Sequence, residues 1–450
     1  MRSLIRINAR EQREVKTRTL KKDKVNIITL GCSKNTVDSE VLLAQLQANA
    51  VQAFHQREKD DCNVIIINTC GFIDNAKQES IDTILNYAQA KTEGEIDKLY
   101  VTGCLSHRYK DELQLEIPEV DAWFGTMELP QILKRFNADY KHELVGERML
   151  STPAHYAYMK ISEGCNRTCA FCAIPLMRGQ HVSRSMEDLV QEARYLAGIG
   201  VKEIMLIAQE LTYYGLDIYK RRALPELLQA LDAVEGIEWI RLHYAYPSKF
   251  PTEILDVMRE GTHICKYLDM PLQHAADHML DAMNRQITRA ETEALIHTIR
   301  EKVPGIAIRT TMLVGFPGET DADIDELCDF IRRMRFDRLG VFTYSHEEGT
   351  SGYALVDDVP AEEKAARAAR VMEVQEEISM EINQLRVGKT YKVLIDRLEG
   401  GYFIGRTMYD SPEVDNEVLI DAARHYVRIG DFVDAHILRA EAFDLFAEPV

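Results

Sequence analysis

Apolar runs alternate with stretches of helical period in the first part of the chain. The runs at residues 26–30, 64–70 and 99–104 predict strands, and each of them leads into a polar-apolar pattern typical of a helix. Strands that alternate with helices form a parallel sheet. We therefore expect an N-terminal parallel α/β domain over residues 25–150.

The same alternation resumes at residue 156 and continues to residue 344. Helical segments separate six strand candidates, at residues 156–161, 203–208, 238–244, 264–268, 307–314 and 339–344. A closed barrel of this type has eight such units, so this number favours a partial (β/α)6 TIM-like barrel. We assign it to residues 151–386, with a long amphipathic helix near its end.

Short alternating segments follow, at residues 391–395, 402–404, 417–420 and 432–437, with glycine turn signals at Gly400, Gly401 and Gly430. This pattern predicts a small antiparallel β-barrel over residues 387–450.

The charge balance bears on the kind of partner. The 450 residues carry a formal net charge of −18, which argues against unaided binding to nucleic acid, because such affinity rests on Lys and Arg neutralising phosphates. From residue 388 onward there are seven basic and twelve acidic residues, a balance that favours a basic protein as partner.

The compartment follows from what the chain lacks. Nine cysteines occur without a signal peptide or an apolar run of the roughly 20 residues that span a bilayer. We expect a cytoplasmic protein with no membrane partner. The first 24 residues are locally basic and predict a disordered tail.

Cysteine ends each of the three N-terminal apolar runs, at Cys32, Cys70 and Cys104. A single cysteine after a buried strand is usually a small hydrophobic residue of the core. Three such cysteines are a stronger signal, because parallel strands finish at one edge of the sheet, where α/β proteins bind ligands. We therefore predict a shared metal or cluster site there. Cys62, Cys265 and Cys328 lack this setting and are assigned to packing.

A second group, Cys165, Cys169 and Cys172, lies within eight residues after the first strand of the barrel. A disulfide framework cannot use an odd triplet this closely spaced, and zinc would normally require a fourth ligand. Three thiolates on a 4Fe–4S cluster leave one iron without a protein ligand, open to a small molecule.

Other candidates follow later strands of the barrel: Gln209 and Glu210, His274, and the stretch from Gly315 through Gly318 to Thr320. The glycine stretch fits either a cofactor cradle or a tight loop with Thr320 or Asp321 capping the next helix. A structural role is the better interpretation of His274.

The spacing Cys165-x3-Cys169-x2-Cys172, with Phe171 before the last cysteine, resembles the cluster motif of radical S-adenosylmethionine (SAM) enzymes. The segments 31–35, 68–71 and 102–104, with a terminal barrel like a TRAM module, resemble the methylthiotransferases over nearly the whole chain. Segments 161–165, 174–179 and 344–350 look more like the RimO family than like the branch that modifies tRNA.

This resemblance implies two 4Fe–4S clusters. It implies an auxiliary cluster on Cys32, Cys70 and Cys104, and a second cluster on Cys165, Cys169 and Cys172 whose open iron binds SAM and cleaves it to a 5′-deoxyadenosyl radical. Further contacts to the cofactor are expected from Phe171, Gln209, Glu210, Gly315, Gly318 and Glu319. Glu210 is a departure, since the family often has Asp there.

The implied activity is addition of a methylthio group to the β-carbon of an aspartate in small-subunit ribosomal protein twelve, free or within the ribosome. An ordinary base cannot remove this hydrogen, so the C–H bond must be broken homolytically by the cofactor's chemistry. A reduced flavodoxin or ferredoxin-type protein is the expected electron donor. Two alternatives are methylthiolation of an adenosine in tRNA and a two-cluster electron carrier or sensor that does not consume SAM.

Overall fold

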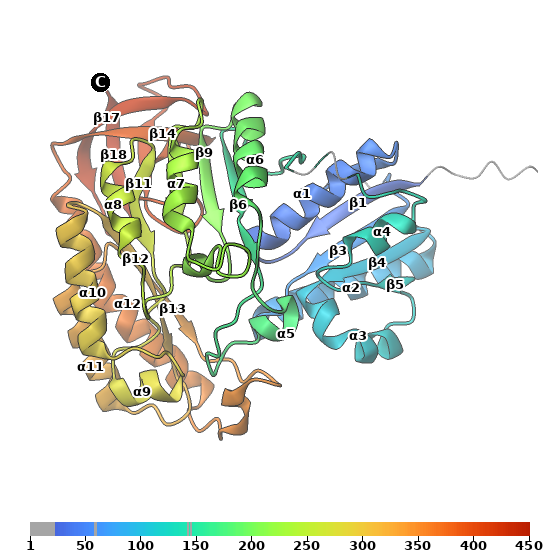
Figure 1. Ribbon diagram of the computed structural model, residues 1–450, viewed down its shortest axis with the longest axis horizontal. Coiled ribbons are helices and arrows are strands. Elements are labelled where there is room, and N and C mark those ends of the chain that lie inside the picture. The colour runs from blue at the N-terminus through green and yellow to red at the C-terminus, as the bar shows by residue number, and fades with distance from the viewer. Residues whose placement is uncertain (1–22, 58–60, 142–143, 145) are drawn as a thin grey trace, which may run out of the picture.

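Three sheets organise the chain in the computed structural model (Figure 1), which describes residues 23–57, 61–141, 144 and 146–450. Of the tail predicted for residues 1–24, Asp23 and Lys24 are described, and Lys24 begins the first strand. The rest of that tail lies outside the described residues. The domain limits drawn above remain a prediction.

The N-terminal sheet is parallel, with strand order β2-β1-β3-β4-β5. Its strands are β1 (Lys24–Thr29), β2 (Gln52–His55), β3 (Val64–Thr69), β4 (Lys98–Gly103) and β5 (Ala122–Trp123), and its helices are α1 (Ser33–Ala48), α2 (Asp74–Glu93), α3 (Cys104–Glu116) and α4 (Leu129–Lys134). Every residue of the central strand β3 is buried, as expected of a strand covered on both faces. The short strands β2 and β5 were not predicted.

The central sheet is a parallel six-stranded open barrel wall, with order β13-β12-β11-β10-β9-β6. Its strands are β6 (Tyr156–Lys160), β9 (Glu203–Ile207), β10 (Trp239–Leu242), β11 (Ile264–Asp269), β12 (Ala307–Val314) and β13 (Arg338–Thr343). The six predicted strands are therefore confirmed. A short antiparallel pair, β7 (Ser162–Glu163) and β8 (Val182–Ser183), was not predicted.

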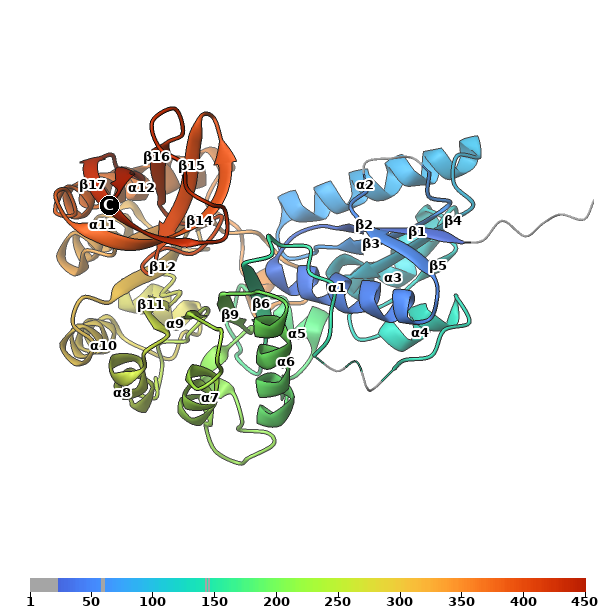
Figure 2. The same cartoon turned by 90° about the horizontal axis from the view of Figure 1, so that it is seen from above.

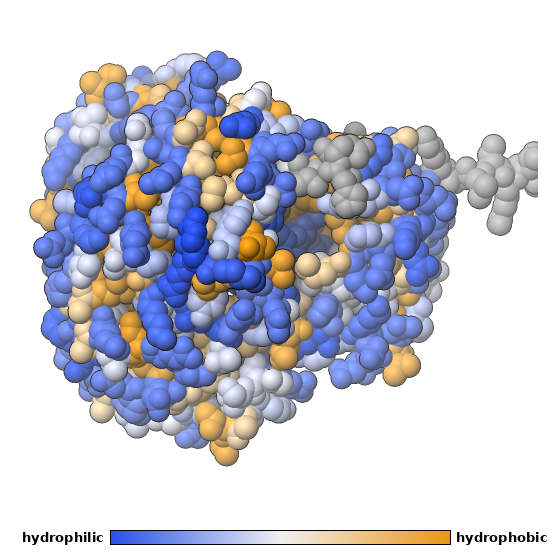
Figure 3. Space-filling model, viewed as in Figure 1, coloured by the Kyte–Doolittle hydropathy of each residue, from blue (hydrophilic) through white to orange (hydrophobic). Residues whose placement is uncertain are grey.

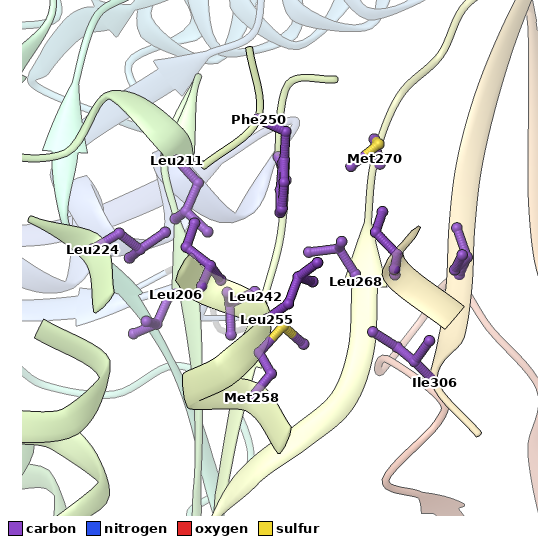
Figure 4. Close-up of a cluster of buried hydrophobic side chains, with 14 of the residues drawn as sticks. Leu206, Leu211, Leu224, Leu242, Phe250, Leu255, Met258, Leu268, Met270 and Ile306 are labelled. Carbon is purple, nitrogen blue, oxygen red and sulfur yellow. The ribbon is translucent and has the colours of Figure 1, made fainter. Parts of the chain in front are cut away.

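Helices pack against this sheet: α6 (Met186–Gly198), α7 (Leu224–Asp232), α8 (Glu253–Glu260), α10 (Arg289–Lys302), α11 (Asp321–Met334) and α12 (Ala361–Gln384). Helix α9 (Asp277–Ala282) lies instead at the carboxyl ends of the strands, beside Ala170 and Phe316. Between them lie α5 (Ile174–Arg178) and the 3-10 turns η2 (Leu211–Tyr213) and η3 (Ser351–Ala354). Leucine, isoleucine and methionine side chains fill the space between strands and helices (Figure 4), among them the fully buried Leu206, Leu255 and Leu268. This burial stabilises the wall that positions the strand ends.

The C-terminal domain is a closed five-stranded barrel, with order β14-β15-β16-β18-β17. Its strands are β14 (Thr390–Glu399), β15 (Tyr402–Thr407), β16 (Glu417–Asp421), β17 (Phe432–Ala440) and β18 (Asp444–Pro449). The predicted barrel is confirmed, with one addition and one difference. Strand β18 was not predicted, and it pairs with β16 in parallel, whereas the other pairs are antiparallel.

The terminal barrel lies against the central sheet, as the view from above shows (Figure 2). Buried charges join the two: the Arg406 guanidinium contacts Glu203 of β9 at 2.7 Å and Asp396 of β14 at 2.6 Å. Over the described ranges, the chain contains no helix long and apolar enough to cross a membrane.

Candidate active site

The strand-end cysteines lie at one edge of the N-terminal sheet. Cys32 caps α1 directly after β1, Cys70 follows β3, and Cys104 begins α3 directly after β4. Because β1, β3 and β4 are hydrogen-bonded neighbours that run in parallel, their carboxyl ends bring the three cysteines together.

Two glycines allow this close approach. Gly31 has φ +87°, and a Cβ there would lie 2.6 Å from Cβ and 2.8 Å from Sγ of Cys70. Gly103 has φ +101°, and its Cβ would lie 2.4 Å from the carbonyl oxygen of Thr69. Both positions therefore require glycine, for conformation and for space.

The thiols of this group differ in burial. Cys32 is exposed, whereas Cys70 and Cys104 are buried. Burial raises the pKa of Cys70, and it raises the pKa of Cys104 to about 11 against the opposing field of Arg178. Bound iron would favour the thiolates that burial disfavours.

The second group of cysteines lies on the loop after β6 and β7, at the mouth of the central barrel. Backbone hydrogen bonds fix this loop: Cys165 donates to Gly179, Cys172 donates to Cys169, and Ala170 donates to Met283. Burial raises the pKa of Cys165 to about 11 and that of Cys172 to about 12.

Several donors point at these sulfur atoms. The backbone N–H of Arg167 donates to Sγ of Cys165 at 3.3 Å, and the guanidinium of Arg285 donates to Sγ of Cys169 at 3.2 Å. The hydroxyl of Tyr246 lies 3.7 Å from the same Sγ and donates to the backbone of Arg285. Such hydrogen bonds stabilise cluster thiolates and tune reduction potential.

Within the described ranges, no three Cys, His, Asp or Glu side chains are grouped so that they could hold one metal ion. A 4Fe–4S cluster takes each thiolate on a different iron, so its ligands do not converge on one point. The donor sets, three thiols each with no carboxylate or imidazole, fit iron–sulfur clusters better than zinc.

Helix α5 connects the two groups of cysteines. It begins two residues after Cys172, and its residues Met177 and Ile174 pack with Cys104 of the N-terminal domain. The hydroxyl of Thr126 donates to the carbonyl of Met177 at 2.9 Å. In Figure 1, α5 lies where the barrel meets the N-terminal domain, beside α3.

Arg178, the last residue of α5, links the two domains through ion pairs. Its guanidinium lies 3.0 Å from Asp38 of α1 and 3.0 Å from Glu163 of β7, and it also donates to Asn35. Although burial raises the pKa of Glu163, Lys160 and Arg178 outweigh burial and lower it to about 2. The interface is therefore held by a network of ion pairs in which Glu163 and Arg178 are buried.

Three residues predicted to contact cofactor lie near the second group. Glu210 is buried and accepts from Arg167 at 3.0 Å and from Thr212. Gln209 donates to Glu163 at 2.8 Å, while its amide oxygen is buried without a partner. Phe171 packs beside Ala170 and Phe316. Their contacts with cofactor stay a prediction.

The glycine stretch after β12 forms a loop closed by Glu319. Gly315 donates to Glu319 at 2.7 Å, and Arg367 of α12 pairs with the same carboxylate at 3.0 Å. Thr320 then caps α11 through a capping box with Asp323, as predicted. Gly318 donates to Asp358. Glu319 therefore has structural partners, and a direct cofactor contact by Glu319 is only a prediction.

His274 also belongs to this structural set. Its side chain is fully buried, its Nδ1 accepts from Ala276, and its Nε2 lies 3.3 Å from Glu319. Because Nε2 is buried without a hydrogen-bond partner, the structural interpretation of His274 stays a prediction. Cys62, Cys265 and Cys328 are buried likewise, as expected for packing.

A cavity of about 440 Å³ lies between α1 and the first strands of the barrel. Its lining includes Asp38, Lys160, Glu163 and Arg184 but none of the six candidate cysteines. Figure 3 shows a hydrophilic face, hollowed between the two halves of the molecule. The cavity therefore adjoins the ionic network and is not itself the cluster site.

Sequence reasoning did not single out Arg178, Arg285, Arg167 or Tyr246. Arg178 lies in segment 174–179, which resembles the RimO family, so the sequence did contain a signal for it. Arg167 stacks between Tyr213 and Tyr246, with its guanidinium carbon 4.2 Å and 3.8 Å from the ring centroids. Nothing in a single sequence places Arg285 beside Cys169, because the contact spans 116 positions.

Three family models match successive parts of the chain. Residues 24–125 match the uncharacterized protein family UPF0004, residues 159–331 match the radical SAM superfamily, and residues 387–450 match the TRAM domain.

Curated relatives match almost the whole chain. The ribosomal protein uS12 methylthiotransferase RimO of Cytophaga hutchinsonii is 64% identical over 97% of this chain and 100% of its own length. Its counterpart in Flavobacterium johnsoniae is 58% identical over the same shares.

Among solved structures, the radical SAM methyltransferase TsrM of Kitasatospora setae has a TM-score of 0.53 at 14% identity, covering 71% of this chain and 73% of TsrM. The radical SAM enzyme OxsB has a TM-score of 0.51 at 11% identity, covering 78% of this chain and 56% of OxsB. At these identities the likeness concerns the fold alone. From its full-length relatives and its radical SAM domain, the chain belongs to the RimO family of radical SAM methylthiotransferases, whose chemistry uses a 4Fe–4S cluster and SAM.

Proposed function

We propose that this protein adds a methylthio group to the β-carbon of an aspartate in ribosomal protein uS12, using two 4Fe–4S clusters. The relatives carry this substrate in their names. The structural observation that carries the proposal is α5, which begins two residues after Cys172 and ends with Arg178 bound to α1 next to Cys32.

Each group of cysteines has a separate task in this proposal. Cys165, Cys169 and Cys172 hold the cluster that supplies radical chemistry when SAM is bound. Cys32, Cys70 and Cys104 hold an auxiliary cluster for the sulfur that is transferred. Arg178 and Glu163 hold the two halves in register, since transfer requires reacting atoms at near-contact distance.

The proposed contacts to SAM are Phe171, Gln209, Glu210, Gly315 and Gly318. The partnerless amide oxygen of Gln209 supports this role, because a buried acceptor without a donor is costly unless a ligand or water satisfies it. The buried Glu319 belongs to the same proposal by acting through the Gly315 backbone, to which it is hydrogen-bonded.

The partners follow from charge and chemistry. The acidic terminal barrel is suited to a basic ribosomal protein, whether free or within the ribosome. A reduced flavodoxin or ferredoxin-type protein in the cytoplasm is the proposed electron source. Methylthiolation of tRNA fits the acidic balance less well.

The test is incubation of reduced, cluster-reconstituted enzyme with SAM and purified uS12, followed by peptide mass spectrometry. We expect a methylthio gain on one aspartate of uS12. No modification of uS12 by enzyme that produces 5′-deoxyadenosine would refute the substrate while leaving the radical chemistry intact.

A further inference from the structure

Lys34 is a buried cation without an acidic partner. The residue is 7% exposed, and it forms no hydrogen bond or ion pair with any part of the chain that the structure describes. Its Nζ is also absent from the set of fully buried polar atoms that lack a partner, so the ammonium keeps some accessible surface. The ammonium is therefore not completely enclosed by protein atoms.

Unlike Lys34, the other buried Lys and Arg residues in the described ranges have a partner for their charge. Arg148, Arg167, Arg178, Arg241, Arg338, Lys364, Arg367, Arg386 and Arg406 each lie within ion-pair distance of a carboxylate. Arg285 donates to Sγ of Cys169 instead. Burying a charge without a counter-charge is costly, so Lys34 is an exception that requires a reason.

The helix around Lys34 offers no compensation. Lys34 lies in the first turn of α1, where the helix dipole disfavours a positive charge, and this turn contains no acidic residue. The ammonium instead lies 3.7 Å from the ring centroid of Tyr244, across the boundary to the central barrel. A cation–π contact stabilises the charge only in part.

Tyr244 is held in place for this contact. Its φ of +64° is unusual for a residue other than glycine, and hydrogen bonds fix its backbone: its N–H donates to Asp269 at 3.1 Å and its carbonyl accepts from Leu211 at 3.1 Å. Strain of this kind persists at functional sites where the surroundings enforce it.

This pair belongs to chain segments that adjoin the two groups of cysteines. Lys34 is two residues after Cys32, and Tyr244 is two residues before Tyr246, whose hydroxyl lies 3.7 Å from Sγ of Cys169. The Lys34–Tyr244 contact therefore joins the segment that follows Cys32 to the segment that contacts Cys169.

We propose that the Lys34 ammonium, supported by the Tyr244 ring, binds the carboxylate of the substrate aspartate and so selects an acidic side chain for modification. This inference rests on the proposed function and deepens it by naming the specificity-determining residue. The substrate carboxylate supplies the counter-charge for Lys34, which pairs with no carboxylate of the described chain. Binding this carboxylate also fixes the position of the adjacent β-carbon of the substrate aspartate.

SAM also carries a carboxylate, so the two sources must be separated. Lys34 lies on the N-terminal domain, next to Cys32, whereas the SAM site by resemblance is at Cys165, Cys169 and Cys172. This placement favours the substrate.

The test measures binding by cluster-reconstituted full-length enzyme, using fluorescence anisotropy with a synthetic segment of uS12 that carries either aspartate or asparagine at the modified position. The wild type should bind the aspartate segment about tenfold more tightly, as expected for one charge-assisted hydrogen bond. Lys34→Met, which keeps the alkyl chain, should abolish this preference, and Lys34→Arg should retain part of it. SAM affinity should be unchanged in both. The matched control is Lys134→Met, an exposed lysine of the same domain that should behave as wild type.

The outcomes are separable. A wild type that binds both segments equally would overturn the inference without any variant, so a folding defect in Lys34→Met does not prevent the test. An aspartate preference that survives in Lys34→Met would overturn it as well, as would a loss of SAM affinity with segment binding unaffected, which would assign Lys34 to the cofactor. Failure of the proposed function would appear instead as absence of methylthiolation by the wild type.

Discussion

The guanidinium of Arg178, in the helix that follows the Cys172 loop, lies 3.0 Å from the carboxylate of Asp38, in the helix that begins after Cys32. This pair joins the two halves of the molecule between their groups of cysteines. Because the Arg178 side chain is 1% exposed, solvent cannot replace it.

Arg178→Ala should therefore damage both stability and transfer. Removing one partner of a buried charge network costs about 3–5 kcal/mol of unfolding free energy, because Asp38 and Glu163 are left without it. SAM cleavage should continue while methylthio transfer falls steeply. The measurement is 5′-deoxyadenosine formed per methylthiolated product. Arg259→Ala, which removes an exposed ion pair, is the control and should leave this ratio unchanged. An unchanged ratio in Arg178→Ala would refute the bridging role.

The two groups of cysteines should be separable by mutation. Cys169→Ala should abolish 5′-deoxyadenosine formation, whereas Cys70→Ala should keep it and lose methylthio transfer. Each variant should bind about half of the wild-type iron, because one of two clusters is lost.

Cys328→Ala is the matched control for these variants, since Cys328 is buried in α11 away from both groups. Its iron content should equal that of the wild type. Equal iron in Cys70→Ala and the wild type would contradict an auxiliary cluster.

Without iron, the thiols of Cys165 and Cys172 should lose their protons only at high pH. Burial raises the pKa of Cys172 to about 12 and that of Cys165 to about 11. Because the pKa in the folded chain is above that of an unfolded cysteine, the buried thiol stabilises the fold fully below the unfolded pKa, and this stabilisation is lost as the pH rises toward the raised value.

Alkylation by iodoacetamide at Cys172 should consequently rise about tenfold per pH unit from pH 8 to pH 10, since only the thiolate reacts. An unperturbed cysteine would level off above pH 9. Peptide mass mapping of the full-length iron-free chain measures this rate, with unfolded chain as the reference. A plateau at Cys172 by pH 9 would contradict the raised pKa of its thiol.

The joint between the central and terminal barrels should depend on Arg406. Arg406→Leu leaves Glu203 and Asp396 buried without this counter-charge, and we expect a loss of about 3–5 kcal/mol in unfolding free energy by urea denaturation. Arg439→Leu removes an exposed pair and should change it by less than about 0.5 kcal/mol. Equal effects of the two variants would contradict a buried joint.

Much of the fold could be predicted because its strands carry long apolar runs. The six central strands and the three strands ahead of Cys32, Cys70 and Cys104 all have this signal. β2 and β5 have four and two residues, too few for a periodic pattern. β18 pairs in parallel with β16, a long-range choice that no local pattern contains.

Only the cysteines of the site could be predicted, from their spacing and from their positions at the ends of strands. A cysteine follows each of β1, β3 and β4, so their convergence follows from the parallel topology. The partners of these cysteines do not repeat: Arg285 reaches Cys169 and Arg178 reaches Asp38 through tertiary packing. Spacing also did not predict that Glu319, a motif residue expected at the cofactor, pairs with Arg367 inside the fold; its contact with cofactor stays a prediction.

The most direct test of the proposed function is a competition. Reduced, cluster-reconstituted enzyme receives SAM together with equal amounts of uS12 and unmodified tRNA, and both are analysed by mass spectrometry. We predict a methylthio group on an aspartate of uS12 and none on the tRNA. A methylthio group on a tRNA adenosine, with uS12 unchanged, would contradict the proposal.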